Sequence, residues 1–315
     1  MVSGRYLLSR LSFSLVTLFL STSVAFFILN VIPGDLAYRI LGEFATPERL
    51  AELRAQLGLN ESITLRYVKW LAALVQGDLG DGAFSGQPVA NEVLRRLPVT
   101  LELAVAASLF GMIFGIPIGL LSAIKSGSMT DSIVRPLSIL GLAVPSFWIA
   151  LMVLIFPSLL WNYSPPRYAS LLENPRDNLQ LMMPAAAILG LAFMASVARL
   201  TRTSMLEVIR EDFMRTARAK GLRSRDVILK HGLRNALIPV ITLSSLQFAT
   251  VLGGTVIIES IFSLPGLGSM VIRSITVRDF PLLQGFVVLM VVVYVTVNLA
   301  IDVFASLLDP RIRLD

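Results

Sequence analysis

The sequence of 315 residues contains no cysteine and one histidine, His231. These absences exclude disulfides, thiolate metal sites, cysteine nucleophiles and a histidine-rich metal centre. Charge is also scarce. Only 15% of the residues are Asp, Glu, Lys or Arg, against about 25% in an ordinary soluble domain. Because 55% of the residues are hydrophobic and the mean hydropathy is +0.75, the composition indicates a membrane protein.

The chain also lacks the pattern that cradles nucleotide phosphates. A Walker A loop needs a lysine directly after a glycine. None of the four lysines, Lys69, Lys125, Lys220 and Lys230, follows a glycine. The nucleophile elbow, the HExxH motif and the EF-hand loop are missing too. We therefore predict no catalytic residues, no metal site and no cofactor in this chain.

Six stretches without charge are long enough to cross a bilayer, which takes about 20 apolar residues. They are Leu11 to Gly34, Leu103 to Ile124, Pro136 to Pro166, Asn178 to Ala198, Asn235 to Ile258 and Phe280 to Ile301. The first is too long for a cleaved signal and lacks a small-residue cleavage site. Alternation at period two is absent, which argues against a membrane β-barrel. The sequence predicts an all-α integral membrane protein with six transmembrane helices.

The basic residues predict the orientation of these helices. With the N-terminus inside, 16 lysines and arginines lie in inner segments and four in the short outer loops. Inner loops of membrane proteins carry the excess of positive charge, so we expect both termini in the cytoplasm. The expected parts are 1–34 with the first span, an extracytoplasmic segment 35–102, and a core of five spans over 103–315.

The extracytoplasmic segment contains a strong helix-start pattern. Thr46 can cap a helix with Pro47 at its first position and Glu48 in its first turn, and Gly58 ends the run. Four glycines at 77, 80, 82 and 86 follow. We expect a helix after Thr46 and a loop at the glycines.

The inner loop 199–234 carries ten basic and four acidic residues and so accounts for the net charge of +6. Charge confined to one loop does not indicate nucleic-acid binding. Ser204 with Glu207 matches a capping box, Asp212 can cap a helix from Phe213 to Lys220, and Ser224 and Asp226 can open a third, ended by Gly232. We expect three short helices folded into a compact protrusion.

Two interpretations of this protrusion remain open. Its positive charge can anchor the loop at the inner face and contact anionic lipid. Alternatively it is a docking surface for a partner protein, on which Phe213 and Met214 are exposed apolar residues and Ala217, Ala219 and Gly221 allow close backbone approach. Lipid anchoring explains neither feature, so the docking interpretation is favoured.

A few polar residues lie within the expected spans. Glu259 and Asp302 lie near span ends, and Asn30, Gln247 and Asn298 lie deeper or at span ends. Roles in a pathway or in helix packing are both open, with interhelical hydrogen bonding expected for the amides. Gly111, Gly115 and Gly119 recur every four residues, a pattern that predicts close packing of the second span against a neighbour.

Taken together, the motifs resemble those of the B-type inner-membrane permeases of ABC importers in the oligopeptide, dipeptide and nickel family. The resemblance covers essentially the whole chain and rests on the runs Ile32–Asp35, Gln56–Leu59, Gly77–Gly80, Pro98–Leu101, Arg215–Gly221, His231–Ala236 with Pro239, Phe262–Gly268 and Asp309–Arg313. The run from Arg215 is similar to the EAA loop of importers, although Arg215 stands where the general pattern has glutamate.

This resemblance implies a type I ABC importer permease fold in the bacterial inner membrane. It implies a second, homologous permease, two ATPase subunits that bind ATP and Mg, and an extracytoplasmic solute-binding protein as partners. The coupling loop would be Phe213, Met214, Arg215, Thr216, Ala217, Arg218, Ala219, Lys220 and Gly221. Di- or oligopeptides are the expected substrates, while nickel chelates, glutathione or oligosaccharides remain alternatives. A secondary transporter driven by an ion gradient is the alternative of another class, although the acids at span ends count against it.

Overall fold

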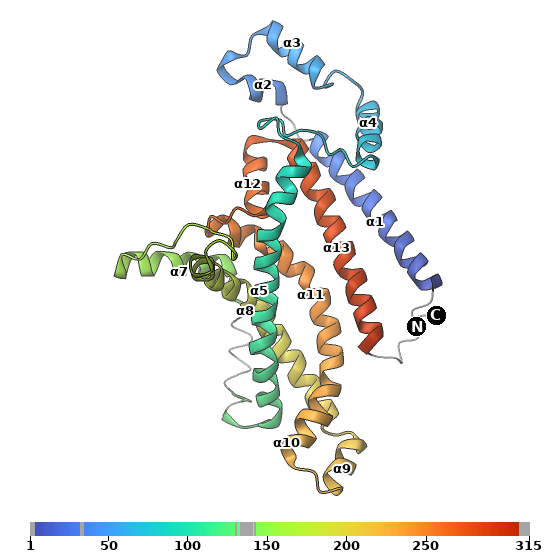
Figure 1. Cartoon of the computed structure of the whole chain (residues 1–315), viewed down its shortest axis with the longest axis vertical. Helices are drawn as coiled ribbons and strands as arrows, with labels where there is room; N and C mark the ends of the chain where they lie inside the picture. The colour runs from blue at the N-terminus through green and yellow to red at the C-terminus, as the bar shows by residue number, and fades with distance from the viewer. Residues whose placement is uncertain (1–3, 32–34, 130, 133–140, 142, 309–315) are drawn as a thin grey trace. The chain divides into compact units, whose positions relative to one another are not determined.

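A computed structural model shows a chain built of helices. It describes all residues except 1–3, 32–34, 130, 133–140, 142 and 309–315, and it describes no side chains at 4–11, 245 and 300–308. The helices are α1 Gly4–Val31, α2 Leu36–Leu41, η1 Gly42–Phe44, α3 Pro47–Gln56, α4 Ile63–Val75, α5 Val89–Ile124, α7 Ser146–Trp161, α8 Pro175–Val208, α9 Asp212–Ala219, α10 Ser224–Asp226, η2 Val227–Leu233, α11 Arg234–Ile261, α12 Leu267–Val277 and α13 Phe280–Leu308 (Figure 1).

Four of the described helices, α1, α5, α8 and α13, are long and apolar enough to cross a membrane. A fifth span is obtained if Ser224–Ser244 and Leu246–Ile261, which meet at an angle of 46°, are counted as one. The predicted third span is represented by α7, whose 16 residues extend about 24 Å, short of a bilayer core of about 30 Å. That prediction starts at Pro136, and 136–140 and 142 lie outside the described residues.

The chain divides into two compact units, one formed by 1–98 with 269–299 and the other mainly by 99–268. In the first unit the end of α1 packs against α4 through aromatic rings. The ring centroid of Phe26 lies 5.3 Å from Tyr67 and 5.2 Å from Trp70. The Ser23 and Tyr67 hydroxyls are hydrogen-bonded at 2.7 Å.

The short helices of the first unit begin as their sequence predicts. The Thr46 side chain accepts a hydrogen bond from the Arg49 amide at the start of α3, and Ser62 caps α4 in the same way. The glycine-rich stretch is a loop, held by the buried Asp279 carboxylate, which accepts from the amides of Ala83 and Phe84 at 3.2 and 3.4 Å. The helix predicted after Thr46 and the loop are both confirmed.

The second unit is organised around α8, which packs against α5 and α11. A Cβ placed on Gly119 would lie 2.3 Å from the Ala198 carbonyl oxygen, and one on Gly115 would lie 2.8 Å from the Met194 carbonyl oxygen. The contact is reciprocal, because a Cβ on Gly190 of α8 would lie 2.6 Å from the Ala107 carbonyl oxygen. The glycine stripe therefore brings two helix backbones into direct contact, as predicted.

Candidate functional site

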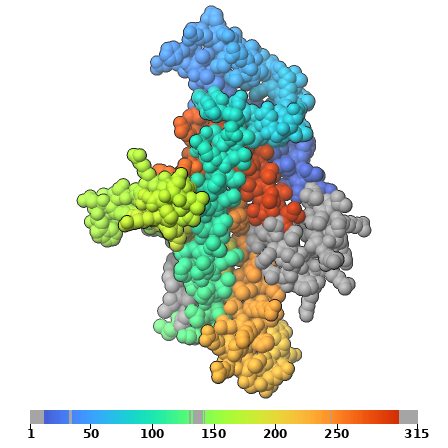
Figure 2. Space-filling view, viewed as in Figure 1, coloured from blue at the N-terminus to red at the C-terminus, as the bar shows by residue number. Residues whose placement is uncertain are grey.

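Within the second unit, the loop between α8 and α11 folds compactly and is visible as the protruding end at the base of the space-filling view (Figure 2). Met214, Ala217 and Val227 form its small core, with Val208 and Ile209 packed against them. Met214 is fully buried. The expectation that Met214 is an exposed apolar residue is therefore wrong, because Met214 and Ala217 share one face of α9 and that face packs against Val227 of η2.

The opposite face of α9 is open to solvent. It carries Phe213, Arg215, Thr216, Arg218 and Ala219, with Lys220 directly after the helix. The Phe213 side chain is 42% exposed. One aromatic ring beside two arginines on the helix and a lysine directly after it is an arrangement suited to contact with another protein, since aromatic and arginine side chains are enriched in interface cores.

The ends of α9 differ in how well the sequence predicts them. Gly221 has a φ of +77°, and its amide donates to the Arg218 carbonyl at 2.9 Å, which is the left-handed helix end that glycine allows. At the other end the cap is Glu211, without a side-chain hydrogen bond. Asp212, predicted as the cap, lies in the first turn and pairs with Arg215 at 3.3 Å.

The other two predicted short helices are wrong in extent. Ser204 does not open a helix but is buried within α8, so the apolar run of the span simply continues through the apparent capping box. The third helix does not stop at Gly232, because α10 continues through the π-helical segment η2 directly into α11. Gly232 is buried beside the Met205 and Met214 side chains and keeps helical backbone rather than a left-handed end.

A buried ion pair that sequence reasoning missed lies where α8 leads into this loop. The Arg202 guanidinium donates through Nε and Nη2 to the two Asp131 oxygens at 2.8 and 3.0 Å. Ser122 Oγ donates to the same carboxylate at 2.6 Å and the Gly127 amide at 3.0 Å. Asp131 is 1% exposed. The network fixes the turn after α5 to α8, and an acid in a short inner turn was its only sequence signal.

Glu259 lies in a second buried network, at the end of α11. Its carboxylate accepts from Thr100 Oγ1 at 2.7 Å and from the Gly268 amide at 2.7 Å, while Thr100 Oγ1 accepts from the Leu267 amide at 2.9 Å. A Cβ on Gly266 would lie 2.4 Å from the Glu259 carboxyl carbon. The glycines of the 262–268 run are thus explained by the close approach of this turn to a buried carboxylate.

The remaining predicted polar residues fall in different units of the chain, with Asn30 and Asn298 in the first and Gln247 in the second. Gln247 on α11 and Asn298 on α13 are half-buried. Asn30 donates to the Phe26 carbonyl of its own helix at 2.8 Å, so the expected interhelical bond from its amide nitrogen is not formed. The Asp302 side chain lies outside the described residues. Among the described side chains, no group of three or more His, Asp or Glu is arranged to hold a metal ion.

Known proteins are similar to this chain in sequence and in fold. The dipeptide transport system permease protein DppB of Escherichia coli (strain K12) is 37% identical over 334 aligned positions, which cover 98% of each chain. DppB of Alkalihalophilus pseudofirmus is 36% identical over 335, covering 98% of this chain and 99% of that one. Among solved structures, the inward-facing MetNI methionine ABC transporter shares the fold, with a TM-score of 0.51 at 18% identity over 69% of this chain and 96% of that one.

Two family models cover nearly the whole sequence. The N-terminal model of binding-protein-dependent transport system membrane components matches residues 3–104. The model of the binding-protein-dependent transport system inner membrane component matches residues 115–314. The resemblance drawn from the sequence motifs is thereby confirmed, and the chain belongs to the binding-protein-dependent transport system inner membrane component family, the permease subunits of ABC importers.

Proposed function

We propose that this chain forms half of the translocation pathway of an ATP-driven importer of di- or oligopeptides. Its family and the dipeptide permeases to which it is 36–37% identical along their full lengths support this assignment. The second half of the pathway is a homologous permease, and a solute-binding protein delivers the peptide outside. The chain has six spans in the bacterial inner membrane, with both termini in the cytoplasm.

Energy reaches the chain through the loop between α8 and α11. Each of two cytoplasmic ATPase subunits binds ATP and Mg, and one of them docks on the face of α9 that runs from Phe213 to Gly221. The observation that carries this proposal is the division of α9 into two faces, with Met214 and Ala217 in the loop core and Phe213 exposed beside cationic side chains. A movement of the ATPase would act on the exposed face of α9, and the buried face would transmit that movement to α8 and α11.

Replacing the exposed ring tests the docking face directly. Phe213→Ala should abolish peptide uptake by the assembled transporter and remove the stimulation of ATPase activity by the binding protein. Because Phe213 contributes little to the loop core, the variant should insert and unfold at the wild-type temperature. Phe44→Ala is the matched control, since Phe44 is also exposed (75%) but lies in the 35–102 segment. Wild-type uptake by the Phe213 variant would refute the docking role.

Gly221 provides a second test. It probes the backbone conformation at the end of α9 rather than a side-chain contact of the docking face. A Cβ at this position meets no atom within 4 Å, yet its φ of +77° disfavours side chains, at a cost of about 1–2 kcal/mol. Gly221→Val should reorient the end of α9 and uncouple ATP hydrolysis from uptake. Gly221→Asn should retain coupling, because asparagine tolerates left-handed backbone. Equal uptake by the two variants would show that this turn does not position the docking face.

A further inference from the structure

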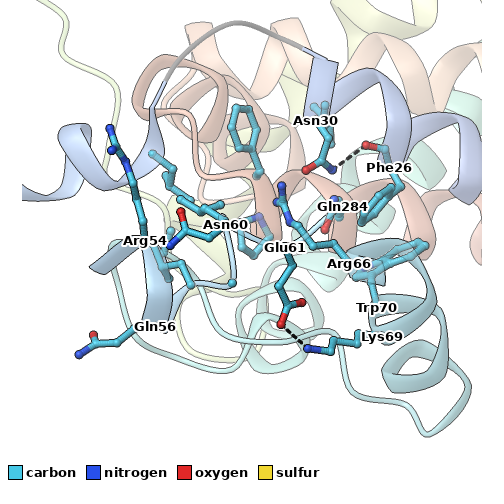
Figure 3. Close-up of a pocket in the computed structure, with 18 of the residues that line it drawn as sticks. Phe26, Asn30, Arg54, Gln56, Asn60, Glu61, Arg66, Lys69, Trp70 and Gln284 are labelled. Carbon is cyan, nitrogen blue, oxygen red and sulfur yellow. Dashed lines mark hydrogen bonds and ion pairs between the residues drawn. The ribbon is translucent and has the colours of Figure 1, made fainter. Parts of the chain in front are cut away.

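A cavity of about 860 Å³ lies within the first unit, between the end of α1, the start of α13 and the helices of the 35–102 segment (Figure 3). Its volume is in the range of about 300–1,000 Å³ that small-molecule sites occupy. Aromatic side chains, Phe26 and Trp70 among them, share its wall with amides and charged groups. The cavity is separate from the loop that carries the proposed ATPase contact, and nothing above assigns it a role.

Most charges on the wall neutralise one another. Arg54 pairs with Asp35, with Nε donating to Oδ2 at 3.1 Å, and Lys69 pairs with Glu61. Two charged groups are left over. Within the described part of the chain, Arg66 and Asp81 line the cavity without an ion-pair partner. The wall thus offers one unpaired cation and one unpaired anion, which is the charge pattern complementary to a zwitterion.

Arg66 is the more confined of the two. It is half-buried on α4, and in Figure 3 its side chain extends toward Asn30 and Gln284, away from the Glu61–Lys69 pair. The Asn30 amide nitrogen donates one hydrogen bond to the Phe26 carbonyl, and Gln284 lines the same cavity as Arg66. A guanidinium offers five donors in a planar fork that matches a carboxylate. A carboxylate seated here would accept from Arg66 and from the Gln284 amide.

The electrostatics of Arg66 agree with this geometry. Burial lowers the pKa of the Arg66 guanidinium, and the negative charge of Glu61 opposes that shift without cancelling it. Taking a cation partly out of water is unfavourable when its charge is not fully compensated. An anionic ligand would supply the missing compensation.

We propose that this cavity binds a short peptide as a zwitterion, with its terminal carboxylate held by Arg66. The proposal rests on the proposed function for its substrate class, but it concerns a site on this chain rather than on a binding protein. It places a peptide contact at the end of α1 and the start of α13, beside the helices of the 35–102 segment. Trp70, which is partly exposed, provides apolar surface for the peptide side chains.

Fluorescence of Trp70 tests the proposal on the full chain in lipid nanodiscs. Substituting the other two tryptophans, Trp148→Phe and Trp161→Phe, leaves Trp70 as the only reporter. Dialanine should change its emission saturably, and dialaninamide, which lacks the carboxylate, should bind at least about tenfold more weakly. Equal affinity for the two peptides, or no saturable change with either up to millimolar concentrations, would overturn the proposal. This comparison changes only the ligand and leaves every residue that lines the cavity in place.

Variants then locate the contact. Arg66→Gln should weaken dialanine binding about tenfold or more while leaving dialaninamide binding nearly unchanged. Arg49→Gln is the matched control, an exposed arginine of α3 that does not line the cavity, and it should bind both peptides as the wild type does. Loss of the same factor for both peptides in the Arg66 variant would indicate a structural role for Arg66 and overturn the assignment.

Uptake by the assembled transporter separates this proposal from the one on which it rests. If the wild-type complex takes up dialanine with ATP and the Arg66→Gln complex takes it up with an unchanged KM, the cavity is not a peptide site but the proposed function stands. If the wild-type complex takes up no peptide, the proposed function itself fails. A raised KM in the Arg66 variant, with kcat retained, is the expected result.

Discussion

Helices α1 and α8 have the same mean hydropathy of 2.0 in their most apolar windows, yet the chain uses them differently. In α8, 61% of the window is buried inside the protein, against 11% in α1. Side chains such as Phe13, Leu15 and Val31 on α1 are largely exposed. The two helices differ in glycine contacts, because α8 meets the glycines of α5 whereas no glycine lies on α1 between Ser12 and Val31. Hydropathy alone thus identifies a membrane-spanning helix but does not show whether the helix packs against protein or faces its surroundings. We propose that the exposed face of α1 contacts lipid or a partner subunit.

The largest effect should come from breaking the buried ion pair at the end of α8. Arg202→Met removes one cationic partner from the buried Asp131 carboxylate, and breaking a buried pair costs about 3–5 kcal/mol. The free energy of unfolding of the full chain in detergent measures this. The double variant Asp131→Asn, Arg202→Met should recover part of the loss, because no charge then remains buried. A single variant as stable as the wild type would show that α8 is not held at this end.

The next effect contrasts apolar side chains on the two helices. Leu181→Ala removes a leucine of α8 that is 2% exposed and should lower the free energy of unfolding by about 2–5 kcal/mol. Leu15→Ala removes a leucine of α1 that is 65% exposed and should change it far less. Comparable losses in the two variants would mean that the face of α1 is packed against protein even in the isolated chain.

A smaller effect tests the glycine contact itself. Gly119→Ala places a methyl group against the backbone of α8 and should destabilise the chain by about 1–3 kcal/mol. Gly253→Ala is the matched control, because Gly253 is also helical but nothing lies within 4 Å of its added Cβ. Removing that glycine should stabilise the helix by about 0.5–1 kcal/mol. Thermal unfolding of both variants should therefore shift in opposite directions, and a shift in the same direction would contradict the packing.

The smallest effect concerns the exposed pair Asp35–Arg54. The Arg54 guanidinium, through its hydrogen bond and its charge, lowers the pKa of Asp35 below its ordinary value. A carboxyl whose pKa is lowered by folding stabilises the fold above its unfolded pKa, and that contribution is lost as pH falls through the folded pKa. Arg54→Met should therefore lower the unfolding temperature slightly at pH 7, and this effect should fade as the pH drops below 3.8 and through the folded pKa of Asp35. A difference that grows on acidification would contradict this sign.

The sequence predicted those features that depend on local chemistry. Thr46 and Pro47 start α3 because a hydroxyl cap and a fixed φ suit the first turn, and Gly221 ends α9 because only a left-handed residue fits there. It failed where tertiary packing overrides local preference. Ser204 and Gly232 look like helix boundaries, but burial within α8 and against Met205 keeps both helical.

The folded loop between α8 and α11 was predicted in position rather than in detail. The charge and glycine pattern located the loop, but the side chains that point inward depend on a pairing of α9 with η2 that no single helix pattern encodes, so Met214 was misplaced. The Asp131–Arg202 pair joins residues 71 positions apart. Only the fold brings such partners together, and neither residue is unusual within its own segment.

Uptake into sealed vesicles tests the central claim most directly. The chain would be reconstituted with the proposed second permease, ATPases and binding protein. Uptake of labelled dipeptide would be measured with ATP and without an ion gradient, and then with a proton or sodium gradient and no nucleotide. We expect uptake only with ATP, and none from this chain alone. Uptake that continues without nucleotide and collapses with the gradient would contradict the account and favour a secondary transporter.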